Sequence, residues 1–139
     1  MIQRVQTIYL LLASISIFVI IFLPIGYQEA ASNSITNIDM LDNLPTSILV
    51  VVSTIIGLLS IFLFKNRKLQ LITTTLFILL SLLTLGSLVF FDFVTGKEFI
   101  TRPNYIPYAL AIFGAIFGIL AHRGISADEK LVRSMDRLR

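Results

Sequence analysis

The residues able to do chemistry are few in this chain, and they stand outside its long apolar runs. It has a single histidine, His122, and no cysteine. Asp92 is the carboxylate nearest to an apolar run, at the point where that run meets a polar segment. Paired carboxylates, a nucleophile beside a base, or a cluster of metal ligands cannot be assembled from such a set. We therefore expect no enzyme activity, no metal site and no cofactor.

Four apolar runs make up most of the chain. They cover residues 5–23, 46–64, 69–91 and 105–121, and none contains an Asp, Glu, Lys, Arg or His. A helix of 19 residues rises about 28 Å, close to the thickness of a bilayer core. A mean hydropathy of +0.91 is too apolar for a soluble domain of this size. The sequence predicts an all-α, multi-pass membrane protein, with residues 1–139 forming one domain of four transmembrane helices in two hairpins.

The first run has a competing interpretation as a secretory signal peptide. Arg4 would be its charged segment, and Ala30 and Ala31 offer small residues for cleavage. The apolar core of a signal is usually about 7–15 residues long. This run is longer and ends at Pro24, which marks a helix exit. We favour a membrane span.

Three cations, Lys65, Arg67 and Lys68, lie in the short turn between the second and third runs. Lys and Arg in short loops are retained on the cytoplasmic side of a membrane, so this turn determines the predicted orientation. Four spans then place nine of the eleven Lys and Arg residues inside. We expect both termini in the cytoplasm. Because the basic residues flank apolar runs and form no stripe, we expect no nucleic-acid partner.

Small residues predict where the helices pack. Ser53 and Gly57 are about one turn apart in the second run, as Gly114 and Gly118 are in the fourth. Such pairs let a second helix approach closely, and we interpret them as contacts within the bundle, with a homo-oligomer seam as the alternative. Hydroxyl side chains of the third run resemble a polar lining, although Ser and Thr in a span commonly bond to their own helix. They are Thr73, Thr74, Thr75, Ser81, Thr84 and Ser87.

The two outer connections predict little regular structure. Residues 25–45 are polar compared with the runs and indicate an ordered loop, with a short surface helix from Ile35 to Leu41 as the alternative. Residues 92–104 carry no net charge and contain Thr95-Gly96-Lys97, a pattern typical of a reverse turn. We expect the third helix to end before this turn.

Residues 122–139 form a predicted cytoplasmic tail with a helix of its own. Arg123 and Gly124 are typical of a helix end, and the capping box from Ser126 to Glu129 then begins a short amphipathic helix. Its basic side comprises Lys130, Arg133 and Arg137, and its apolar side Leu131, Val132, Met135 and Leu138. We predict that this helix lies on the cytoplasmic membrane face, against anionic lipid or a partner. The alternative is a solvated helix that merely ends the protein.

Both ends of the chain resemble one protein family. Residues 1–12, 128–134 and 136–139 are similar to the opening and closing motifs of the domain of unknown function 4293 family, small bacterial integral membrane proteins of four helices. The resemblance extends to the layout of the spans. It implies a bacterial plasma (inner) membrane protein and indicates no catalytic activity or ligand.

Two functions are consistent with these observations. The first is a non-enzymatic membrane interaction or assembly module, which uses its basic C-terminal helix to bind lipid or another membrane protein. The second is a small transporter or channel that works as an oligomer, because a hydroxyl-lined path does not need charged residues within the apolar layer. The absence of ionisable side chains from the four runs favours the first, since ion-coupled transporters usually place one there.

Overall fold

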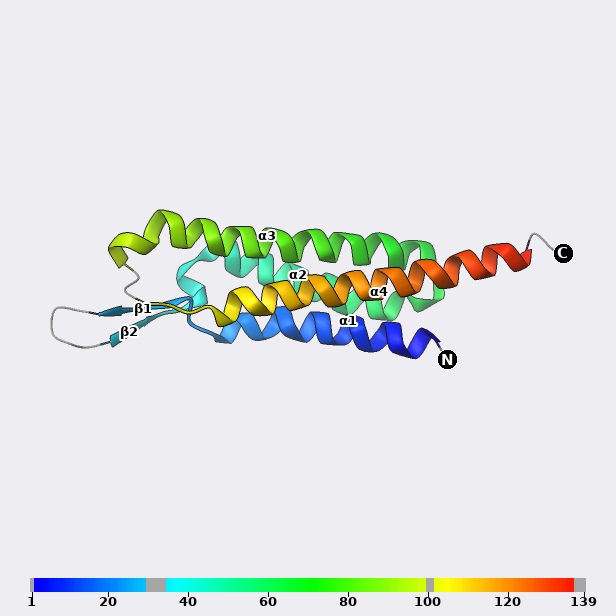
Figure 1. Cartoon of the computed structure of the whole chain (residues 1–139), viewed down its shortest axis with the longest axis horizontal. Coiled ribbons are helices and arrows are strands. Elements are labelled where there is room, and N and C mark those ends of the chain that lie inside the picture. Colours follow the sequence, from blue (N-terminus) through cyan, green and yellow to red (C-terminus); the bar gives the residue numbers. More distant parts are fainter. Residues whose placement is uncertain (1, 30–34, 100–101, 137–139) are drawn as a thin grey trace.

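The computed structural model describes residues 2–29, 35–99 and 102–136. The protein is almost entirely helical, and four long helices run side by side (Figure 1). These helices are α1 (Ile2–Val19), α2 (Leu44–Phe62), α3 (Arg67–Phe99) and α4 (Ile106–Asp136). All four are long and apolar enough to cross a membrane. This confirms the prediction of an all-helical chain with four candidate spans.

The four helices form a closed ring. Helix α1 contacts α2 and α4, and α3 contacts the same two helices from the other side. The start of α1, the end of α4 and the α2–α3 turn lie at one end of the bundle (Figure 1). We call it the basic end, because Lys65, Lys68 and Lys130 are exposed in these segments. The opposite end carries short β-strands, and we call it the sheet end.

Buried residues recur along every helix at alternating spacings of three and four. In α3 this series is Gln70, Thr74, Phe77, Ser81, Thr84 and Leu88. In α1 it is Gln6, Leu10, Ala13, Ile17 and Ile20. A mean spacing of 3.5 residues is that of helices packed knobs-into-holes in a left-handed bundle. Each helix therefore presents one narrow seam to the interior.

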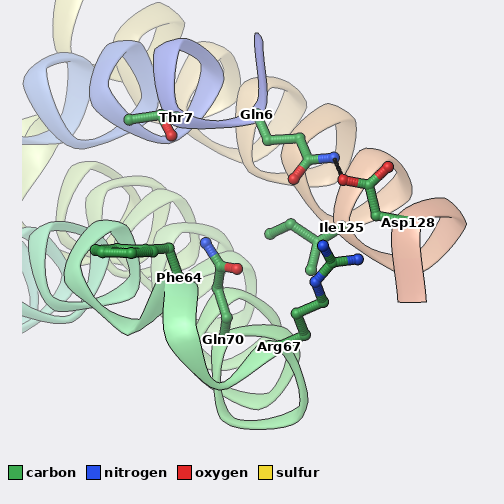
Figure 2. Close-up of a pocket in the computed structure, with 7 residues that line it drawn as sticks. All are labelled: Gln6, Thr7, Phe64, Arg67, Gln70, Ile125 and Asp128. Atoms are coloured by element: carbon green, nitrogen blue, oxygen red, sulfur yellow. Dashed lines mark hydrogen bonds between the residues drawn. The ribbon is translucent and has the colours of Figure 1, made fainter. Parts of the chain in front are cut away.

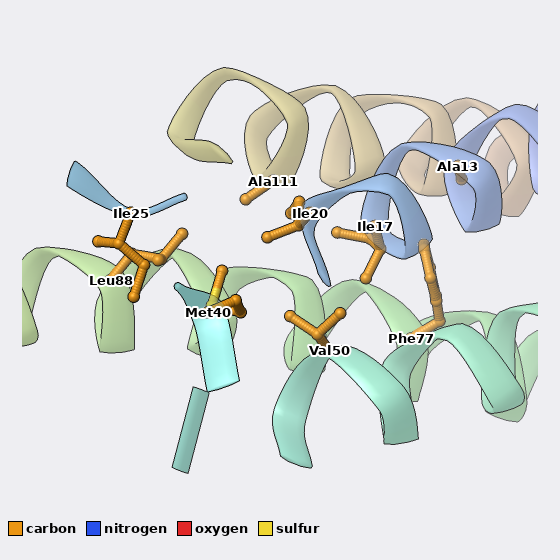
Figure 3. Close-up of a cluster of buried hydrophobic side chains, with 9 residues drawn as sticks. All are labelled: Ala13, Ile17, Ile20, Ile25, Met40, Val50, Phe77, Leu88 and Ala111. Atoms are coloured by element: carbon orange, nitrogen blue, oxygen red, sulfur yellow. The ribbon is translucent and has the colours of Figure 1, made fainter. Parts of the chain in front are cut away.

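The seams and the outer faces have opposite compositions. Large apolar side chains such as Ile8, Ile48 and Leu79 face outward. The interior holds many small or hydroxyl side chains beside a few large ones, and Figure 3 shows its main apolar cluster. Side chains outside gain by contact with lipid tails, whereas small ones inside let the helices approach closely. This distribution is the reverse of that in a soluble bundle.

The Phe77 ring of α3 fills space that two glycines leave in neighbouring helices. A Cβ placed on Gly57 of α2 would lie 2.9 Å from this ring, and one on Gly118 of α4 would lie 3.2 Å from it. Phe77 itself is completely buried. Gly57 also faces the Ser14 hydroxyl of α1, so a side chain there would meet two helices.

The two glycines predicted to pack in the fourth span face different helices. A Cβ on Gly114 would lie 2.7 Å from Ile17 Cδ1 of α1, whereas one on Gly118 would lie 2.9 Å from Ile78 Cγ1 of α3. The pair therefore lets α4 approach α1 and α3 at successive turns. Ser53 of α2 is buried as well, and its hydroxyl donates to the Leu49 carbonyl at 2.6 Å.

The first outer connection contains strands, so the alternative of a surface helix from Ile35 to Leu41 is wrong. Strand β1 (Gly26–Glu29) pairs antiparallel with β2 (Ile35–Ile38), and a 3-10 helix (Met40–Asp42) follows. Three β-branched residues, Ile35, Thr36 and Ile38, favour the extended form. Pairing with β1 then provides hydrogen-bond partners for the backbone of β2. The apolar spacing of residues 35–41 does not reveal this pairing.

A third strand joins the two outer connections. Strand β3 (Arg102–Pro103) pairs with β1 on the side opposite β2. The Asn104 side chain donates to the Pro24 carbonyl at 2.9 Å, and its Oδ1 accepts from the backbone N–H of Ile106 at 3.2 Å. Asn104 thus fixes the sheet to the start of α4. Ile25 and Met40 are buried beneath the sheet.

Helix α3 is longer than the predicted third span, and the predicted reverse turn at Thr95-Gly96-Lys97 is wrong. The helix continues to Phe99 and comprises 33 residues, or about 50 Å against a bilayer core of about 30 Å. One glycine in a helix interior costs only about 1 kcal/mol, which does not by itself end a helix. Figure 1 shows the last turns of α3 extending past the start of α4.

Helix α4 is also continuous, so the predicted separate C-terminal helix is wrong. Gly124 and Ser126 lie within a single helix of 31 residues. A Cβ on Gly124 would lie 2.8 Å from Gln6 Cγ of α1. This glycine therefore allows close approach of α1 and does not end the helix. The predicted lipid-facing tail loses the hinge that would turn it onto the membrane surface.

The glycine contacts generate a test with an internal control. We expect Gly57→Ala to lower the free energy of unfolding by about 1–3 kcal/mol, because the added methyl group overpacks the Ser14 and Phe77 contacts. Gly86→Ala has no atom to meet within 4 Å, and alanine is the better helix former, so this variant should be unchanged or more stable. Steric trapping in detergent micelles measures both. An equal loss of unfolding free energy in the two variants would contradict the close packing around Gly57.

Candidate functional site

A small polar cavity lies at the basic end, between α1, α3 and α4. It has a volume of about 20 Å³, enough for a single water-sized group. Figure 2 shows the seven side chains that line it, which are Gln6, Thr7, Phe64, Arg67, Gln70, Ile125 and Asp128. Polar groups from three helices therefore meet where the bundle ends.

The strongest contact at this cavity joins the first helix to the last. Gln6 Nε2 of α1 donates a hydrogen bond to Asp128 Oδ2 of α4 at 2.8 Å. Both side chains are buried, with exposed fractions of 6% for Gln6 and 8% for Asp128. Hydrogen bonds to a charged group are roughly twice as strong as neutral ones. This bond fixes α4 to α1 beyond the last apolar contact, which is made by Ile125.

Arg67 and Gln70 belong to the first turns of α3. Gln70 is buried, and Arg67 is half-buried, with its side chain extending toward Ile125 (Figure 2). In the structure the turn is shorter than predicted and ends just before Arg67. The 3-10 helix Leu63–Lys65 leads to Asn66, whose Oδ1 accepts from the backbone N–H of Leu69 at 3.3 Å. Arg67 thus lines the cavity, whereas Lys65 and Lys68 remain exposed.

Helix α4 continues past this cavity. Eight residues separate Asp128 from the last helical residue, Asp136, so the helix rises about 12 Å beyond the hydrogen bond to Gln6. Figure 1 shows this end of α4 extending past the other three helices. Lys130, Leu131 and Val132 are exposed on it. We call residues 129–136 the helical extension.

The structure does not describe the side chains of two predicted basic residues, Arg133 and Arg137. The backbone of Arg133 belongs to the helical extension, and Arg137 lies outside the described residues. Ser53, Gly57, Gly114 and Gly118 lie inside the bundle, away from the basic end. The structure therefore brings Arg67 to the cavity, leaves Lys130 on the extension, and separates both from the packing residues.

Most interior hydroxyl groups of the described helices form hydrogen bonds within their own helix. They donate to a carbonyl three or four residues earlier, as Thr74 does to Gln70 at 2.7 Å and Thr84 to Leu80 at 2.9 Å. Such bonds satisfy each hydroxyl locally. An exception joins two helices, where the hydroxyls of Thr46 and Ser87 share a hydrogen bond near the sheet end. Within residues 2–29, 35–99 and 102–136, no group of three or more His, Cys, Asp or Glu residues could hold a metal.

Sequence reasoning missed Gln6 and Asp128 as partners. A signal was present, because Ala121, Ile125 and Asp128 continue the spacing of four and three that marks the α4 seam. The capping-box interpretation of residues 126–129 concealed it. A carboxylate at a seam position requires a buried partner, and Gln6 occupies the matching position of α1.

These features define a class of protein. Four helices of membrane-spanning length, with large apolar side chains outside and small ones within, are characteristic of a polytopic membrane protein. The chain belongs to the family described as Domain of unknown function (DUF4293), whose model matches residues 2–138. No curated protein and no solved structure matches the chain.

The hydrogen bond between Gln6 and Asp128 can be measured by a double-mutant cycle. We expect Gln6→Leu to cost about 1–3 kcal/mol of unfolding free energy, because it leaves a buried carboxylate without its donor. Asp128→Asn should cost less, since the new amide oxygen still accepts from Gln6. Combining Gln6→Leu with Asp128→Leu should recover part of the loss, because neither polar group is then left unpaired. Fully additive losses would contradict the contact.

Proposed function

We propose that this protein is a non-enzymatic interaction module of the bacterial plasma (inner) membrane, whose helical extension binds the acidic surface of another protein. The observation that carries the proposal is the continuity of α4 through Gly124 to Asp136. A single helix that begins inside the bundle holds its end in a fixed direction. Basic and apolar groups are presented on this end, from Lys130 to Val132.

The proposed orientation places both termini and the α2–α3 turn in the cytoplasm. The four helices then cross the membrane as two antiparallel pairs. Support comes from the cations of the basic end. Lys65 lies in the short connection between α2 and α3, and Arg67 and Lys68 lie in the first turn of α3. Arg123 lies in the part of α4 at the same end. Cations in such positions resist transfer across the membrane.

The direction of α4 favours a protein over the lipid surface as the partner. From Arg123 to Lys130 the helix rises about 10 Å, and this end of α4 extends past the other three helices (Figure 1). Attraction to anionic headgroups falls off within about one Debye length, roughly 8 Å at physiological salt. In the proposed orientation Lys65 and Lys68, around the start of α3, are therefore better placed than Lys130 for contact with anionic lipid.

The alternative, a small oligomeric transporter or channel, has less support. Interior hydroxyls are satisfied within their own helices, and Ile25, Met40 and Leu88 close the bundle at the sheet end with fully buried apolar side chains. A path for solute would then require an interface between copies. The outer faces of the helices are mostly apolar and offer few polar groups, such as Thr75, to line it.

Cysteine labelling tests the orientation, and the absence of native cysteine makes each introduced thiol unique. Thr36 lies exposed on β2 at the sheet end, and Asn66 lies exposed in the turn at the basic end. We expect an impermeant maleimide to label Thr36→Cys in intact cells and Asn66→Cys only after the membrane is opened. The reverse pattern would overturn the orientation.

Photocrosslinking tests the partner. A photoreactive phenylalanine analogue at Val132 reports on the helical extension, and the same analogue at Phe64 is the matched control, because both side chains are exposed at the basic end. We expect a discrete adduct with a second protein from position 132 and none from position 64. Changing Lys130, Arg133 and Arg137 to Gln should reduce that adduct at least severalfold, because the attraction is electrostatic.

Three outcomes would count against this function. Equal adducts from both positions would mean that the extension has no special role. An adduct that still forms after the three charges are removed would show that the partner does not bind through an acidic surface. An adduct of twice the mass of the chain would identify a homo-oligomer in place of a different protein.

A further inference from the structure

Gln70 of α3 has a buried side-chain amide that the protein leaves without a hydrogen bond. The side chain is only 6% exposed. The backbone carbonyl of Gln70 accepts from the hydroxyls of Thr73 and Thr74, but no group of the described residues bonds to its amide. Buried amides are nearly always paired, either with protein or with ordered water. The Gln70 amide therefore calls for a partner from outside the chain.

Such a partner can reach the Gln70 amide, because the amide borders the small cavity at the basic end and is directed toward α1 (Figure 2). Among the described residues, Asn43 Nδ2 is the one buried side-chain nitrogen or oxygen that is both unpaired and fully covered by protein. The unpaired atoms of Gln70 are thus not fully covered. The cavity volume is about 20 Å³, and a single water molecule needs roughly 10–15 Å³ of such volume.

Arg67 and Asp128 line the same cavity without contacting each other. Their side chains carry opposite charges, yet in the part of the chain that the structure describes they form neither a hydrogen bond nor an ion pair. Asp128 accepts from Gln6 Nε2 at 2.8 Å. A carboxylate can only accept, so Gln6 must direct its N–H toward Asp128, which leaves Gln6 Oε1 as a second acceptor. Polar groups that face each other without touching are commonly bridged by water.

The chemistry of the lining selects the occupant. Arg67 repels a cation, and Asp128 repels an anion. Arg67 and the Gln70 amide offer N–H donors, whereas Asp128 and Gln6 Oε1 offer acceptors. The occupant must therefore be neutral, must donate and accept at a single atom, and must fit a volume of about 20 Å³. Water meets all three conditions.

We propose that this cavity binds one ordered water molecule, which accepts from Arg67 or Gln70 of α3 and donates to Asp128 of α4. Buried waters typically form about three hydrogen bonds to groups that are otherwise unpaired. The water joins α3 to the hydrogen bond between α1 and α4, directly before the helical extension begins. Arg67 and Gln70 are then positioning residues for the extension. This inference goes beyond the proposed function and holds whichever partner the extension meets.

Nuclear magnetic resonance of the full chain in detergent micelles tests for the water. A water that stays bound while the protein tumbles gives a nuclear Overhauser effect (NOE) to nearby protons, with a sign that separates it from proton exchange. We expect this effect at the side-chain amide protons of Gln70. Asn66 is the control, because its side chain is exposed at the same end and meets bulk water, so it should show none.

Two results would overturn the water site. The first is the absence of the NOE at Gln70. The second is a shift of the Gln70 amide resonance when chloride in the buffer is replaced with sulfate, because this would identify an anion as the occupant.

Matched variants in the first turn of α3 test the role of Arg67. Arg67→Met removes a donor from the cavity, whereas Lys68→Met removes a neighbouring charge that is exposed to solvent. We expect the water NOE at Gln70 to be lost in Arg67→Met and kept in Lys68→Met. An NOE that persists in Arg67→Met would show that Arg67 does not hold the water.

Spin labels at Ile72 of α3 and Lys130 of the helical extension measure the positioning, since both side chains are exposed. We expect the distribution of distances between them to broaden in Arg67→Met and in Gln70→Leu, because each variant removes a group that binds the water. Lys68→Met should keep the original width. Equal widths in all three variants would contradict the link between the water and the extension.

Discussion

The bundle depends on close contact between helix backbones, and the Phe77 ring shows how this contact arises. Apolar helices gain little by leaving lipid for one another, so van der Waals packing must hold them together. Glycines at positions 57 and 118 let the ring fill the space between α2 and α4, and Gly114 admits Ile17 in the same way. At the basic end, the lack of a side chain at Gly124 likewise lets Gln6 of α1 pack closely against α4. Each glycine thereby fixes the distance between two neighbouring helices of the ring.

Polar links between separate elements lie at the two ends of the bundle. At the basic end Gln6 bonds to Asp128, and at the sheet end Asn104 bonds to the Pro24 carbonyl. Between them the hydroxyl groups bond to carbonyls of their own helices, so the middle is held by packing. The helical extension continues beyond the polar link at the basic end, and it is the part that we propose to meet another protein.

The sequence predicts the long helices well, because an apolar run of this length has few stable alternatives to a membrane-spanning helix. Helix ends were harder to predict, since Gly96 and Gly124 are local stop signals, yet α3 and α4 continue through them. The strand Ile35–Ile38 forms because β1 pairs with it, and the apolar spacing of residues 35–41 taken alone does not reveal that partner. Asp128 was misassigned for a related reason, because its role depends on Gln6, which lies 122 residues away.

The central claim is that α4 is one rigid helix from the bundle into the helical extension. Pulsed electron spin resonance between labels at Phe113 and Lys130, both exposed on α4, tests it directly. A continuous helix predicts a narrow distance distribution centred near 25 Å, since 17 residues separate these positions and each adds about 1.5 Å. A right-angled break at Gly124 predicts a broader distribution near roughly 19 Å. The shorter distance in liposomes would contradict the continuous helix and the partner-binding role that rests on it.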